Sequence, residues 1–63
     1  MNKVVAYLKD GMYVFGANLP IQPRVGEFIE SAGMLFEIKM VTYAVEPGYN
    51  TAITIKLIVD YVR

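Results

Sequence analysis

In two stretches of the chain, residues 34–46 and 51–63, every second side chain belongs to a set that is almost entirely apolar, and Pro47-Gly48-Tyr49-Asn50 lies between them. Alternation with a period of two is typical of a β-strand, because successive side chains point to opposite faces of a sheet. Pro and Gly between the two stretches favour a short loop. The pattern therefore predicts a long antiparallel hairpin, and this segment constrains the fold most strongly.

One face of this predicted hairpin is suited to a protein core. If Glu46 faces Thr51, the side chains on that face are nearly all apolar. They are Phe36, Ile38, Met40, Thr42, Ala44, Ile53, Ile55, Leu57, Val59 and Tyr61. The same register places Glu37 opposite Asp60, which is mildly unfavourable because like charges repel.

A second register of the hairpin contains a β-bulge near residues 40–42. A bulge adds one residue to one strand and so exchanges the two faces beyond it. In that case Val41, Tyr43 and Val45 would turn toward the core.

Three shorter strands are predicted before the hairpin. Asp10-Gly11 signals a two-residue turn, because both residues tolerate positive φ. Pro20 and Pro23 lack amide donors and favour a loop over residues 18–23, and Gly33 suits a turn over residues 31–33. The predicted strands are residues 3–9, 12–17, 25–30, 34–46 and 51–63. These features predict a single all-β domain over residues 1–63, a small five-stranded barrel or a related sheet.

From Pro23 the chain reads PRVGEFIE and then, from Gly33, GMLFEIKMV. This order of Pro, Val, Gly, acidic residue, Ile, Gly, aromatic and alternating apolar residues resembles small SH3-like β-barrel proteins of bacteria and their phages. The matching positions are Pro23, Val25, Gly26, Glu27, Ile29, Gly33, Phe36, Ile38 and Val41. The resemblance implies an SH3-like barrel of bacterial or phage origin, and it implies no chemistry.

The composition argues against catalysis and against bound metals. The 63 residues include no Cys and no His, so disulfides are impossible and a zinc site would need carboxylates alone. Nucleophilic triads usually use a His base, and Ser31, the only Ser, lies in a predicted turn. We therefore expect no enzyme activity, no cofactor and no metal.

Charge and hydropathy limit the class of partner. Six basic and six acidic residues give a net charge of zero, so no basic excess attracts nucleic acid or an anionic membrane. No stretch carries the 20 or so apolar residues that a membrane-spanning helix needs. We expect a cytoplasmic protein without a signal peptide.

Apolar residues make up 56% of the chain, which is more than one core face uses. The surplus, which lies outside the predicted core face, consists of Tyr13, Phe15, Val41, Tyr43, Ile58 and Val62. Small domains without disulfides often gain stability by association, so these six predict the interface of a homo-oligomer. The alternative is that several of them line the far wall of the same barrel.

The function that follows is a non-catalytic binding or assembly module that works as a homo-oligomer and caps or blocks a partner protein. One alternative is an oligomer that sequesters a small anionic ligand resembling a nucleotide, with Arg24 on its phosphate and Tyr49 and Asn50 around it. Another is a single-strand nucleic-acid binder that stacks bases on its aromatic residues. The neutral net charge disfavours this last alternative.

Overall fold

The computed structural model describes residues 2–48 and 52–62, which form five β-strands. The strands are β1 (Asn2–Leu8), β2 (Tyr13–Leu19), β3 (Phe28–Ser31), β4 (Met34–Glu46) and β5 (Ala52–Tyr61). The predicted all-β fold is confirmed, and every predicted strand is present with ends shifted by at most three residues. Within the described residues, no helix is long and apolar enough to cross a membrane.

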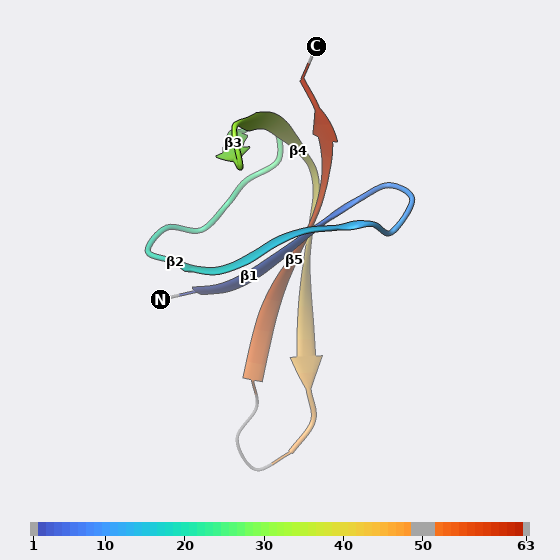
Figure 1. Cartoon of the computed structure of the whole chain (residues 1–63). Coiled ribbons are helices and arrows are strands. Elements are labelled where there is room, and N and C mark those ends of the chain that lie inside the picture. The colour runs from blue at the N-terminus through green and yellow to red at the C-terminus, as the bar shows by residue number, and fades with distance from the viewer. Residues whose placement is uncertain (1, 49–51, 63) are drawn as a thin grey trace.

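The strands form one sheet in the order β2-β1-β5-β4-β3. The pairs β1–β2, β3–β4 and β4–β5 are antiparallel, whereas β1 and β5 pair in parallel from Val4↔Ile55 to Leu8↔Val59. Figure 1 shows the β1–β2 hairpin crossing the long β4–β5 hairpin, so that the sheet curls strongly from one edge to the other. The two end strands, β2 and β3, do not pair, and the architecture is a half-barrel with two free edges.

The core lies on the concave face of this half-barrel. Direct partners in neighbouring strands share a face. The register therefore places Val4 beside Ile55, and Ala6 beside Leu57, where β1 pairs with β5. The buried apolar residues are Val4, Ala6, Phe36, Ile38, Ile55, Leu57 and Val59. Leu8, Val14, Phe15, Leu19, Ile29 and Val41 pack around them and are partly buried.

The register of the β4–β5 hairpin changes at Lys39. From Phe36↔Tyr61 to Ile38↔Val59 the pairs are those of the bulge-free register, and Glu37 does face Asp60. Beyond a bulge, Val41 pairs with Leu57. The bulge-free register is therefore wrong beyond Ile38. The alternative register with a bulge is confirmed, although the bulge lies at Lys39, one to three residues before its predicted position at residues 40–42.

The bulge has a direct effect on which side chains are buried. Val41 turns toward the core, and Met40, predicted to be buried, is 55% exposed on the convex face. Ile53 and Tyr61 were also predicted in the core and are 55% and 43% exposed. Both lie outside the stretch of β5, from Ile55 to Val59, that pairs with β1.

The turns of the β1–β2 and β3–β4 hairpins each differ from their prediction by one residue. At the β1–β2 turn the N–H of Gly11 donates to the carbonyl of Leu8 over 2.9 Å, so Lys9 and Asp10 are the central residues and only Gly11 has positive φ. The predicted two-residue Asp10-Gly11 turn is thus displaced by one residue. The β3–β4 turn is one residue shorter than predicted, because Ser31 belongs to β3 and pairs with Met34, and its two residues, Ala32 (φ 51°) and Gly33 (φ 78°), are both left-handed.

The chain is more extended than a compact domain of its size. Its radius of gyration is 12.0 Å, against about 10.6 Å for a typical 63-residue domain. Its accessible surface is 4742 Å², whereas a compact 7.1 kDa monomer exposes about 4100 Å². The half-barrel therefore leaves roughly 650 Å² of extra surface in contact with water.

Candidate functional site

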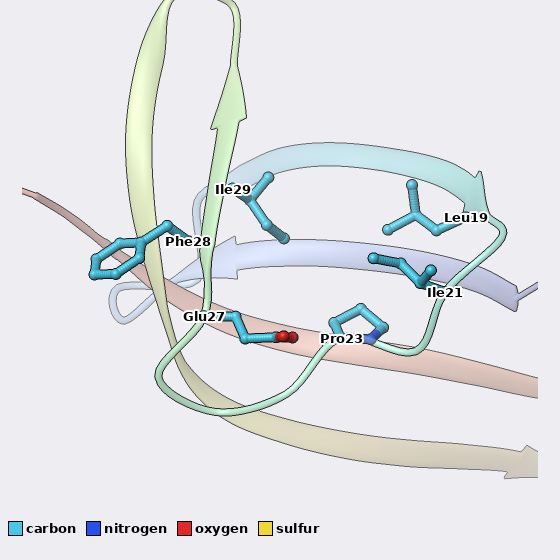
Figure 2. A pocket seen from close by; sticks show the side chains of 6 residues that line it. All are labelled: Leu19, Ile21, Pro23, Glu27, Phe28 and Ile29. Carbon is cyan, nitrogen blue, oxygen red and sulfur yellow. The ribbon is translucent and has the colours of Figure 1, made fainter.

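An apolar groove lies between the two free edges of the half-barrel. It consists of two adjoining hollows that share Leu19, Ile21 and Ile29, with volumes of about 400 and 520 Å³. We call it the edge groove. Its further described lining residues are Phe15, Gly16, Ala17, Pro20, Pro23, Glu27, Phe28, Glu30 and Ser31. Figure 2 shows Ile29 reaching from β3 toward Leu19 and Ile21, whereas the Phe28 ring points away.

The strand register explains why the groove is apolar. Ala17 pairs with Val4 and Phe15 with Ala6, so these β2 side chains face the concave side with the core. Ile29 faces the same side from β3, because it pairs with Phe36. The core face therefore continues without interruption to both free edges, where no further strand covers it.

The segment 20–27 connects the two free edges and forms the floor of the groove. Pro23 is the buried residue of this segment. The N–H of Glu27 donates to the carbonyl of Arg24 over 3.2 Å, and Gly26 (φ 91°) supplies the positive φ that this turn requires. The Glu27 carboxylate closes the turn by accepting from the Arg24 N–H over 2.8 Å.

Two further bonds tie this segment to β4. The N–H of Gly26 donates to the carbonyl of Ile38, and the N–H of Ile38 donates to the carbonyl of Glu27, each over 2.9 Å. Gln22 also donates to the Tyr43 hydroxyl. The floor of the groove is thus held to the sheet at both of its ends, which makes the groove a preformed feature of the fold.

The chemistry of the edge groove suits apolar contact and backbone pairing. Among its described lining residues only Glu27 and Glu30 carry charge, and neither is a cation that could attract a phosphate. In the described part of the chain, no group of three or more acidic side chains could hold a metal ion. An extended peptide or a second apolar surface is the kind of ligand that these groups accept.

A second apolar surface crosses the convex face. The register aligns Tyr13, Tyr7, Ile58 and Met40 across four strands, and we call this the convex row. Tyr13 is 60% exposed, and its ring meets that of Tyr7 edge-on at 6.0 Å. The Lys56 ammonium lies 5.7 Å from the centre of the Tyr7 ring, in cation–π range.

The structure divides the six predicted interface residues between the two faces. Tyr13 and Ile58 belong to the convex row, and Val62 lies on the same face, because its N–H donates to the carbonyl of Leu35 and continues the register. Phe15, Val41 and Tyr43 lie on the concave face, where the first two pack against the core. The six therefore form two separate groups and not one patch.

Of the three predicted ligand residues, the structure describes one. Arg24 is exposed in the turn that closes the floor of the edge groove. Tyr49 and Asn50 lie outside the described residues. Sequence reasoning missed Leu19, Ile21 and Ile29, which line both hollows of the groove. The available signal was that Ile21 is a large apolar residue between two prolines.

Comparison with known proteins finds no family model that matches the chain, and no curated protein or solved structure with significant similarity to it.

Proposed function

We propose that the chain is a non-catalytic binding and assembly module that works as a homo-oligomer and uses its remaining exposed surface to cap or block a partner protein. The observation that carries this proposal is the edge groove, an apolar core face that continues uncovered to two free strand edges. The SH3-like assignment belongs to the same proposal and rests on the segment from Pro23 to Val41.

The amount of exposed surface supports self-association. The excess of roughly 650 Å² over a compact monomer is close to the 800 Å² or so that each partner buries in a standard protein interface. Covering large apolar side chains contributes about 1.5–3 kcal/mol for each one fully buried. Several such residues lie along the groove and the convex row.

The presence of two apolar surfaces on opposite faces supports the second part of the proposal. One surface can be covered by another copy of the chain while the other remains open. The convex row ends at Tyr13 and Met40, which are 60% and 55% exposed. Aromatic side chains and Met are enriched where proteins bind one another, so this row is the surface that we assign to a partner protein.

Light scattering coupled to size-exclusion chromatography tests the proposal. We expect a molar mass that is a multiple of 7.1 kDa and that falls toward that of one chain on dilution. A mass of one chain at every concentration would overturn the proposal.

A further inference from the structure

The outer edge of β2 has a bulge at its start, where the register with β1 shifts between Phe15 and Tyr13, and it has none of the other usual protections against pairing with another strand. The outer edge of β2 pairs with no other described strand. Its residues, Tyr13–Leu19, contain no charge and no proline. Natural proteins protect such edges with charged residues, proline, β-bulges or a short strand length, because free N–H and C=O groups can form hydrogen bonds with a further strand.

The opposite edge of the sheet is protected in this way. β3 has only four residues, Phe28–Ser31, and it carries Glu30 with Glu27 just before it. Two copies of this edge would bring like charges together, which costs several kcal/mol at an interface. The contrast between the two edges identifies β2 as the one open to a partner strand.

We propose that the partner strand is β2 of a second copy, so that two β2 strands pair antiparallel across a twofold axis and join two half-barrels into one continuous sheet. This inference rests on the proposed homo-oligomer and names its interface. A strand can pair with its own copy in this way because an antiparallel backbone ladder is self-complementary. An uncharged strand adds no like-charge repulsion.

The side chains of β2 favour the same arrangement. Phe15, Ala17 and Leu19 share the concave face, so a register that matches these three residues with one another keeps both core faces on one side of the joined sheet. The two edge grooves then meet across the axis. The joined surface would cover apolar side chains of the groove in both copies.

Two substitutions of an exposed alanine by lysine test whether β2 forms the interface. Ala17→Lys places a charge on β2, and Ala52→Lys places the same charge on β5 near the end of the long hairpin. Across a twofold axis the two ammonium groups that A17K introduces would lie close together. We expect A17K to weaken self-association roughly 100-fold, and A52K to associate as the unchanged chain does. Sedimentation velocity measures both, with circular dichroism to confirm the strand content.

The outcomes distinguish this inference from the proposed function. An A17K variant that is folded and still associates fully would overturn the β2 interface and leave the homo-oligomer standing. An unchanged chain that never associates would overturn both. If A17K does not fold, hydrogen exchange of the unchanged chain decides the matter: β2 amides that gain protection as concentration rises support the inference, and β2 amides whose protection is constant while the chain associates refute it.

Discussion

The Tyr13 side chain lies over Gly16 on the convex face, with its hydroxyl oxygen 2.8 Å from the point where a Cβ on residue 16 would be. A glycine in a strand interior weakens the strand, because it offers no side chain for packing. An aromatic ring that covers the glycine offsets part of this loss. The same ring meets Tyr7 edge-on, so residue 16 controls where one end of the convex row lies.

Replacing this glycine tests the relationship. Alanine in a strand is better than glycine by about 0.5–1 kcal/mol, but in Gly16→Ala the new methyl group would lie 2.8 Å from the Tyr13 hydroxyl, so the Tyr13 side chain must shift relative to Tyr7. The loss of that aromatic pair costs about 0.5–1.5 kcal/mol. We therefore expect Gly16→Ala to be neutral or destabilising in the unchanged chain and to stabilise the Tyr13→Ala variant. Urea unfolding of the unchanged chain, the two single variants and the double variant gives the coupling free energy between residues 13 and 16. A coupling free energy near zero would show that the Tyr13 ring does not depend on Gly16.

The turn between β3 and β4 contains a residue that is poorly suited to its backbone. Ala32 has φ 51°, and a left-handed conformation costs a residue with a Cβ about 1–2 kcal/mol. Asn tolerates this region and is preferred before Gly in such turns. We expect Ala32→Asn to raise the free energy of unfolding by about 1 kcal/mol and the thermal midpoint by roughly 5 °C. Ala32→Val, as the control, should lower both; a stabilising Val would contradict the turn geometry.

The bulge at Lys39 predicts unequal costs for two neighbouring substitutions. Ile38 is 1% exposed and Met40 is 55% exposed. We expect Ile38→Ala to lower the free energy of unfolding by about 2–5 kcal/mol and Met40→Ala to lower it by about 0.5 kcal/mol or less. Chemical unfolding of dilute protein measures both values without a contribution from association. Equal large costs would indicate the bulge-free register, in which both residues face the core.

The pair of acidic residues across β4 and β5 predicts a substitution that stabilises the chain. Glu37 faces Asp60, and Lys39 binds Glu37 over 3.2 Å and not Asp60. Asp60→Asn removes the like charge and keeps an oxygen that can accept from the Tyr61 N–H. We expect a gain of about 0.2–1 kcal/mol at low ionic strength, which decreases in high salt because exposed charges are screened. A gain that does not change with salt would point to a cause other than repulsion.

Strand positions follow closely from the sequence, because alternation and turn residues are local signals. The sequence alone does not decide between the hairpin register with a bulge and the register without one, because both give an apolar face. That face contains Met40 in the bulge-free register and Val41 in the bulged one. The parallel pairing of β1 with β5 has no local signal at all, because it depends on how two hairpins pack. That pairing sets which edges stay free, and so the edge groove was not predicted.

The interface residues were harder to place for a related reason. An apolar residue outside one core face lies either on the second face of the sheet or, beyond a bulge, on the first. Tyr13 and Ile58 are examples of the former, and Val41 is an example of the latter. Ile21 lies in a loop, as predicted, but the loop prediction does not indicate that its side chain lines the groove beside Pro23.

Sedimentation velocity of the unchanged chain over a wide range of concentration tests the homo-oligomer most directly. We expect a boundary that moves faster as concentration rises, with a limiting mass that is a multiple of 7.1 kDa. A single slow boundary with the mass of one chain at all concentrations would contradict it.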